Sequence, residues 1–157
     1  IWQFRYDPKV GSLTPAGSVP SGPPGRAALG PRYLQFHPKL PVCYVINELS
    51  CEISVFSFDA EKAKVLADEG ESVSTLEIIQ TVLTVPAGFP TSLNTCGRIA
   101  VHSGGEFVLA ANRGHDSIAV FKVDHESEPP GMLEMIDLQH TRGRTPRHFK
   151  FDISGQW

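Results

Sequence analysis

Apolar and polar residues alternate along short stretches of the chain, and each stretch ends in a cluster of Gly, Pro, Asn or Asp. A period of two residues is typical of β-strands with one face against a core, and such clusters are typical of turns. The stretches are also rich in Val, Ile and Phe, which favour strands. The predicted strands span residues 33–37, 42–47, 52–58, 75–83, 98–102, 106–111, 117–123 and 133–138.

Helical periodicity is almost absent from the chain. The stretch DAEKAKVLADEGES, residues 59–72, is the one place where a short helix is an alternative. Its many charged residues favour a solvated loop, and a loop is what we predict there.

The strand pattern repeats along the chain. Residues 34–59 align with residues 99–124 at a constant offset of 65. At this offset identical residues coincide: His37 and His102, Asn47 and Asn112, Ile53 and Ile118, Val55 and Val120, Phe56 and Phe121, and Asp59 and Asp124. Residues 1–7 match the end of the same unit, and residues 145–157 match its beginning.

Four short strands in a unit that repeats in tandem predict the blades of a β-propeller. We expect an all-β fold of four-stranded antiparallel blades, with the end of one blade in residues 1–29, a full blade in 30–95, a second in 96–144 and the first strand of another in 145–157. A propeller closes with about 4 to 8 blades, so we expect this chain to be a piece of a ring. A β-sandwich is the alternative, but it gives no reason for the repeat.

Composition limits the classes of partner. The 157 residues are 41% hydrophobic and 20% charged, with a net charge of −3 and a pI of about 6.1. An acidic protein has no bulk electrostatic reason to bind nucleic acid or an anionic membrane, and the basic loop at 140–150 lacks the stacking aromatics of single-strand binders. No apolar run approaches the roughly 20 residues of a membrane span. The oligomeric state is left open.

Three cysteines, Cys43, Cys51 and Cys96, show neither C-x-x-C pairing nor the spacing of metal ligands. Their odd number and wide spacing favour reduced thiols in a cytoplasmic protein. The first residue is Ile1, and the opening residues lack the layout of a signal peptide. We therefore expect a cytoplasmic fragment that uses no metal and no cofactor.

Charged residues lie just before the first strand and just after the second strand of the predicted blades. Because neighbouring strands are antiparallel, these two places meet at one edge of a blade. In a propeller the first strand lines the central channel, so the residues gather at one channel mouth, here called the rim. The candidate rim residues are Arg32, Glu48, Arg113, His115, Arg147 and His148.

These residue types suit an anionic substrate and one proton transfer. Arginine binds phosphate or carboxylate through two parallel hydrogen bonds, so Arg32, Arg147 and His148 are candidates for substrate binding. The remaining three, Glu48, Arg113 and His115, are candidates for catalysis.

Glu48 should have a lowered pKa beside arginines and be ionised as a general base. A histidine, His115 or His148, could transfer a proton near neutral pH.

Each candidate also has a structural alternative. Arg32 and Arg147 could close the loops that enter their blades, Glu48 could only pair with one arginine, and His115 could serve its turn. His37 and His102 stand at matching strand ends, which predicts a shared structural role. The equivalent asparagines, Asn47 and Asn112, should serve the turns.

Several stretches resemble the lactonase family of seven-bladed β-propellers: GPRYLQFHP, YVINELSCEISVFSFD, LTVPAGF, FVLAANRGHDSIAVFKVD and TPRHFKFDISGQW. Together they cover nearly the whole chain. The resemblance implies that Arg32 in the PR motif, Glu48 in the NE turn and Arg113 in the NR turn are active-site residues.

Three departures from the family pattern stand out. Tyr33 replaces the histidine that usually follows GPR, and Arg98 stands where glutamate is common. The histidine assigned to catalysis in the muconate-lactonizing members lies in an earlier blade, outside this chain.

The resemblance implies lactone hydrolysis, with 6-phosphogluconolactone, a sugar phosphate of the pentose phosphate pathway, as the expected substrate. Arginines would hold the phosphate and polarise the ester carbonyl, while Glu48 or a histidine activates water. Serine and zinc hydrolases are disfavoured, because the chain has neither G-x-S-x-G nor H-E-x-x-H. The alternatives are a cycloisomerase of the muconate type, which would consume no water, and an inactive propeller that binds other proteins.

Overall fold

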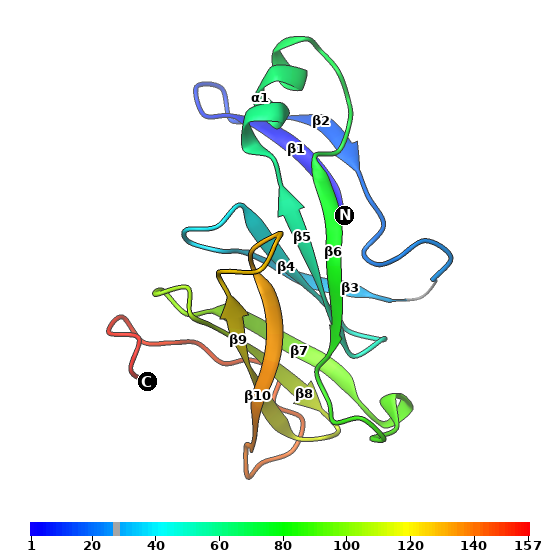
Figure 1. Ribbon diagram of the computed structural model, residues 1–157, viewed down its shortest axis with the longest axis vertical. Coiled ribbons are helices and arrows are strands. Elements are labelled where there is room, and N and C mark those ends of the chain that lie inside the picture. The colour runs from blue at the N-terminus through cyan, green and yellow to red at the C-terminus, as the bar shows by residue number, and fades with distance from the viewer. Residues whose placement is uncertain (27–28) are drawn as a thin grey trace.

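Ten strands form three antiparallel sheets in the computed structural model, which describes residues 1–26 and 29–157 (Figure 1). A two-stranded ribbon consists of β1 (Trp2–Asp7) and β2 (Ser12–Ser18). The first four-stranded sheet consists of β3 (Pro31–Phe36), β4 (Val42–Asn47), β5 (Glu52–Phe58) and β6 (Leu76–Leu83). The second consists of β7 (Thr95–Val101), β8 (Phe107–Arg113), β9 (Ser117–Asp124) and β10 (Met132–His140).

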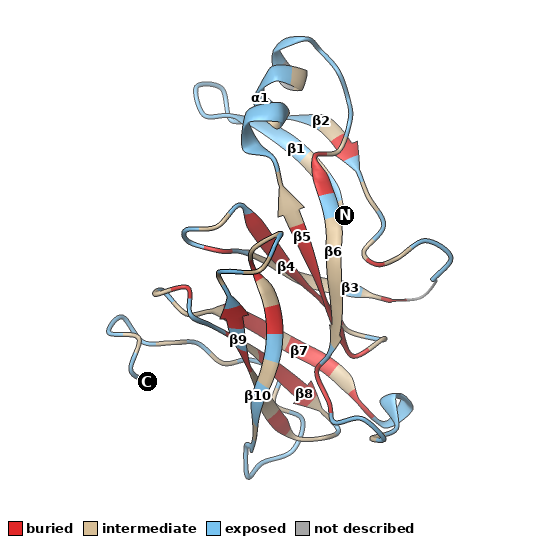
Figure 2. Cartoon of the chain, viewed as in Figure 1, coloured by how far each residue is buried: buried red, intermediate tan, exposed pale blue. Residues whose placement is uncertain are grey.

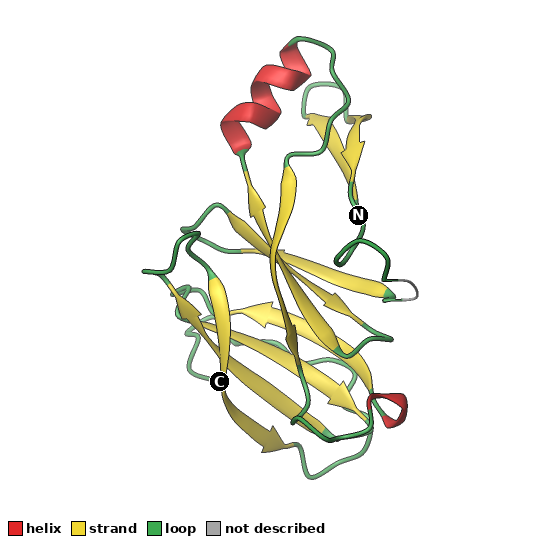
Figure 3. Ribbon diagram, turned by 45° about the vertical axis from the view of Figure 1, so that its right-hand side comes forward, coloured by secondary structure: helices red, strands yellow, loops and turns green. Residues whose placement is uncertain are grey.

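Both four-stranded sheets are simple meanders, in which each strand pairs antiparallel with the next one along the chain. The two sheets are stacked, with β3 next to β7 and β6 next to β10 (Figure 3). Equivalent strands therefore lie side by side, as they do in neighbouring propeller blades. The predicted all-β fold of four-stranded antiparallel blades is confirmed, and every predicted strand up to residue 138 is present to within a few residues.

The first blade is buried on both faces. All six residues of β4, VCYVIN, are buried. Alternate residues such as Tyr44 and Ile46 pack between the two blades, whereas Cys43 and Val45 pack on the opposite face with Ile1. Figure 2 shows buried residues concentrated in the central strands and exposed ones in the β1–β2 ribbon. Because each fully buried aliphatic or aromatic side chain contributes about 1.5–3 kcal/mol, packing between blades is a main source of stability.

A histidine at the end of the first strand joins each blade to the chain that follows. His37 accepts hydrogen bonds at Nδ1 from the backbone N–H groups of Lys39 (3.0 Å) and Leu40 (2.8 Å), so its proton lies on Nε2, 2.8 Å from the carbonyl oxygen of Gly105. His102 repeats this arrangement, since its Nδ1 accepts from Gly104 and its Nε2 lies 3.2 Å from the carbonyl oxygen of Gly155. The predicted structural role of these two histidines is confirmed.

The loop predicted at 59–72 is wrong in its first half, because residues Ala60–Asp68 form the helix α1. Asp59 caps this helix by accepting a hydrogen bond at Oδ1 from the backbone N–H of Lys62 at 2.8 Å. Gly70 follows the helix with a left-handed φ of 77°. Good helix formers between two such caps outweigh the high charge of the segment.

Residues 145–157 were expected to contain the first strand of another blade. They form no strand with any described residue. A strand needs a hydrogen-bonded neighbour, and this segment instead runs past the second blade as an extended tail (Figure 1). A short 3-10 helix, η1 (Thr91–Leu93), lies between the two blades in the sequence. The predicted end of the first partial blade at residue 29 borders residues 27–28, which lie outside the described residues.

We predict that His37 makes stability depend on pH. Burial lowers the pKa of His37, the nearby His125 and Lys39 add to this, and the Gly105 carbonyl and Glu106 act in the opposite direction. Because the folded-state pKa lies below the ordinary value, the unfolded chain binds the proton more readily. The stabilisation is complete above the ordinary pKa of about 6.5 and declines as the pH falls toward the folded-state pKa.

Urea unfolding at pH 7.5 and pH 5.5 measures this effect. The wild type should lose more stability between the two values than His37→Gln does. The control is His148→Gln, which changes an exposed histidine and should leave the wild-type difference intact. An equal pH response in wild type and His37→Gln would contradict the assignment.

Candidate active site

The start of β3 and the turn after β4 are held together by the backbone. The N–H of Glu48 donates to the carbonyl oxygen of Gly30 at 2.6 Å, and the N–H of Leu49 donates to that of Leu29 at 3.0 Å. Gly30 has a left-handed φ of 67°, and a Cβ added to it would lie 2.8 Å from Leu49 Cγ. A glycine is therefore needed to bring the PR motif against the NE turn.

Glu48 is bound by two arginines from two blades. Arg32 Nε lies 3.0 Å from Glu48 Oε2, and Arg113 Nη2 donates to Glu48 Oε1. Arg113, at the end of β8, also donates to the carbonyl oxygen of Cys96 at 2.9 Å. The backbone N–H of Cys96 in turn donates to the carbonyl oxygen of Glu48 at 3.0 Å. Side chains and backbone thus join the two blades at this point.

This pairing sets the charge of Glu48. Burial raises the pKa of its carboxyl group, but the hydrogen bonds and charges of Arg113 and Arg32 outweigh burial and hold the pKa below its ordinary value. The carboxylate is therefore ionised at neutral pH. About a third of its side chain, 32%, remains exposed, so a small molecule could reach it.

Arg113 is positioned by the glycine that follows it in the NRG turn. Gly114 has φ 126°, and a Cβ there would collide with the backbone of Leu93, the last residue of η1, and of Asn94, which follows it. Asn112, which precedes the arginine, is buried and donates to the carbonyl oxygen of Thr84 at 2.6 Å. The turn is therefore packed against the segment that follows β6. Asn112, predicted to serve its turn, also joins that turn to this segment.

His115 lies on the same turn but faces other partners. Its Nδ1 is 2.9 Å from Ser117 Oγ, its ring stacks on His140 with centroids 5.0 Å apart, and Phe89 contacts it edge-on. Burial lowers its pKa, with a further lowering from His140. Because His140 ends the outermost strand β10, His115 is directed toward the outside of the blade and away from Glu48.

Arg147 and His148 are exposed on the tail, and no described residue forms a hydrogen bond or an ion pair with either side chain. The backbone of this PR motif nevertheless lies against the second blade. A Cβ added to Gly97 would be 3.0 Å from the carbonyl oxygens of Pro146 and Arg147. The tail thus passes beside β7, whose residue Gly97 accepts a hydrogen bond from Arg32 at 3.4 Å.

Two residues that the sequence marked only as departures lie beside the arginine pair. The guanidinium carbon of Arg32 is 4.7 Å from the ring centroid of Tyr33, and that of Arg98 is 5.0 Å from it. The offset of 65 could have predicted this contact, because it places Tyr33 in β3 and Arg98 in β7 at the same position of two adjacent first strands.

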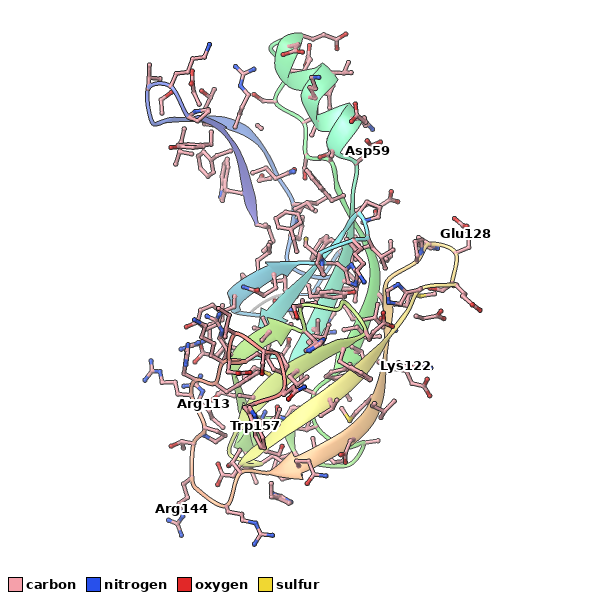
Figure 4. All side chains as sticks on the ribbon, turned by 90° about the vertical axis from the view of Figure 1, so that its left-hand side faces the viewer. Asp59, Arg113, Lys122, Glu128, Arg144 and Trp157 are labelled. Atoms are coloured by element: carbon pink, nitrogen blue, oxygen red, sulfur yellow. The ribbon has the colours of Figure 1, made fainter. Side chains whose placement is uncertain are left out.

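A hollow with a different lining lies on the second blade. A cavity of about 670 Å³ is bordered by Glu106, Lys122, Asp124, Glu126 and Glu134, among others. Figure 4 shows Lys122 and Arg113 at opposite edges of the second blade. Because carboxylates dominate its lining, this cavity does not suit an anionic lactone, and the Arg32–Glu48–Arg113 group is the better candidate.

Two further observations concern the described residues only. They contain no cluster of three or more His, Cys, Asp or Glu side chains arranged to hold a metal ion. No helix among them has the length and apolar content needed to cross a membrane.

Comparison with known proteins decides the family. The family model "Lactonase, 7-bladed beta-propeller" matches residues 1–157. The chain belongs to the seven-bladed β-propeller lactonase family. A 6-phosphogluconolactonase of Bacillus subtilis is 36% identical to it over 95% of this chain, but over only 37% of the relative. The chain thus spans little more than a third of that lactonase.

Solved structures agree with this membership. A protein from Lactobacillus plantarum superposes with a TM-score of 0.80 and 26% identity, covering 98% of this chain and 39% of that one. The periplasmic gluconolactonase of Pseudomonas aeruginosa gives a TM-score of 0.69 and 26% identity, with 98% and 38% covered. The two blades of this chain therefore have the arrangement of the matching part of two larger proteins.

We predict that Gly30→Ala weakens both the fold and the rim. The substitution combines a left-handed φ with a contact on Leu49, so we expect a loss of about 1–3 kcal/mol. Gly70→Ala is a matched control, because Gly70 also has a left-handed φ (77°) but nothing lies within 4 Å of the added Cβ. Urea unfolding of both variants measures the difference. Equal losses would show that the contact with the NE turn has no effect.

Proposed function

We propose that the protein hydrolyses a sugar lactone, with 6-phosphogluconolactone as the substrate. The observation that carries this proposal is the pairing of Glu48 with Arg32 and Arg113, from two adjacent blades, on the rim of a chain whose relatives include a 6-phosphogluconolactonase. A lactone needs a cation at its carbonyl oxygen and a water molecule directed at its carbonyl carbon. An arginine and a carboxylate in contact can supply both.

In the proposed reaction, Arg113 donates hydrogen bonds to the ester carbonyl oxygen, where negative charge develops. Glu48 accepts a hydrogen bond from water and takes its proton as the water oxygen bonds to the carbonyl carbon. The bond between the carbonyl carbon and the ring oxygen then breaks. The ring oxygen takes up the proton, so one water is consumed and an open-chain acid is formed.

Two arginines on one carboxylate have opposite consequences for this role. They keep Glu48 ionised and fixed in orientation, but a carboxylate with a lowered pKa is a weak base. The main contribution of Glu48 is then to orient the water molecule. Polarisation of the carbonyl by Arg113 is the larger part of catalysis. Because a lactone is a reactive ester, we expect an oriented water and a polarised carbonyl to be enough for its hydrolysis.

We predict that Glu48→Gln and Arg113→Ala both lower kcat/KM in the full-length polypeptide, by about 100-fold for the glutamate and about 100- to 1000-fold for the arginine. The assay is hydrolysis of freshly prepared 6-phosphogluconolactone, with product analysis in ¹⁸O-labelled water. Hydrolysis places the label in the acid, whereas a cycloisomerisation takes up none.

The control variant is Arg26→Gln, which breaks the ion pair of Arg26 with Glu52 and should keep the wild-type rate. If Glu48→Gln and Arg113→Ala also keep that rate, the two assignments are wrong.

A further inference from the structure

The mechanism proposed above leaves Arg98 without a role. This residue lies in β7, the first strand of the second blade, and its guanidinium rests over the ring of Tyr33 from the first blade. Arg32 rests over the same ring. A tyrosine ring attracts cations through its π-face, so Tyr33 holds two guanidinium groups near Glu48 although those groups repel each other.

Positive charge is in excess at this place. Arg32 and Arg113 both pair with Glu48. Among the described residues no carboxylate lies within 4.0 Å of the Arg98 guanidinium. Glu48 thus pairs with two guanidinium groups, and a third lies on the tyrosine that one of them also contacts. Bringing cations together and partly burying them is unfavourable unless an anion joins them.

The hydrogen-bond donors of Arg98 are also incompletely used. Its Nε is buried and has no hydrogen-bond partner, although buried donors in folded proteins are nearly always paired. The side chain as a whole is half-buried. It therefore packs on Tyr33, and within residues 1–26 and 29–157 no carboxylate or carbonyl group binds its guanidinium.

We propose that Arg98, held in place by Tyr33, binds the anionic substituent of the lactone and selects a phosphorylated substrate over a neutral one. This inference rests on the proposed function. Arg32 and Arg113 are already committed to Glu48 and to the ester carbonyl, whereas Arg98 has no carboxylate partner among the described residues and is available for a phosphate. Arginine is suited to this task because its planar donors match phosphate oxygens.

The surroundings of Tyr33 agree with a cationic subsite. A hydrogen bond from Arg32 lowers the pKa of the Tyr33 phenol, burial opposes this, and the charge of Arg32 with the hydrogen bond and charge of Arg98 lower it further. The phenol therefore reports on the charge beside it. An anion bound at Arg98 should raise its ionisation pH.

Two substrates that differ only in the phosphate test the selection. In the full-length polypeptide, Arg98→Gln should raise KM for 6-phosphogluconolactone at least about tenfold and change kcat little, because a charge-assisted hydrogen bond is lost. Both constants for unphosphorylated gluconolactone should stay unchanged. Arg98→Lys, which keeps the charge, should fall between. The matched control is Arg144→Gln, an exposed arginine in the turn that follows β10 (Figure 4). Equal effects on the two lactones, or no effect on either, would overturn the proposal.

A second measurement separates this inference from the proposed function. Inorganic phosphate is added while the near-ultraviolet absorbance of tyrosinate is followed against pH, and the difference between wild type and Tyr33→Phe gives the contribution of Tyr33. Phosphate should raise the ionisation pH of Tyr33 in the wild type and leave it unchanged in Arg98→Gln. If wild type hydrolyses neither lactone but shows this shift, the hydrolase proposal fails and the anion subsite stands. A shift of the same size in Arg98→Gln, or none in wild type, refutes the subsite.

Discussion

Contact between adjacent blades is the constraint on which the rest of this structure depends. The central strand of the first sheet, β4, is buried on both faces, and polar groups at the edges of the sheet find partners in the next blade. At one end of β3, His37 bonds to the carbonyl of Gly105. At the other end, Glu48 bonds to Arg113 and to the backbone of Cys96. The contacts that align the blades are thus the same contacts that assemble the candidate site.

Because the same contacts serve both purposes, the stability of the fold is linked to the geometry of the candidate site. A carboxylate between two arginines is stabilised as an anion, and an ion pair that remains partly solvated contributes little to folding on its own. Its larger effect is on geometry, because it fixes the orientation of two side chains whose backbones belong to different sheets. Preorganised donors of this kind lower the cost of binding a developing negative charge.

Much of the fold follows from local patterns, and less of the site does. Alternation and the offset of 65 locate the strands and identify Arg32, Glu48 and Arg113 as neighbours, because strand order fixes which chain ends meet. The charge of the segment before β6 predicts a loop, but the caps at Asp59 and Gly70 and the helix formers between them stabilise the helix α1. The direction of His115 could not be predicted, since it depends on packing against Phe89 and His140 from other segments. The tail at 145–157 matches the first strand of a blade in sequence. It forms no strand, because a strand also needs a neighbouring strand to which its backbone can hydrogen-bond.

The repeat also explains why the excess cation stands where it does. Arg32, Gly97 and Arg147 occupy one position of the repeated PR motif, and the second blade alone has glycine there. The carbonyl oxygens of Pro146 and Arg147 come so close to Gly97 that a Cβ would meet them at 3.0 Å, so a side chain at that position would require the tail to shift. Arg98, one residue later, occupies the position equivalent to Tyr33. This stretch of β7 contains a shift in register between Cys96 and Ile99, and its cation lies over the tyrosine ring of the neighbouring blade.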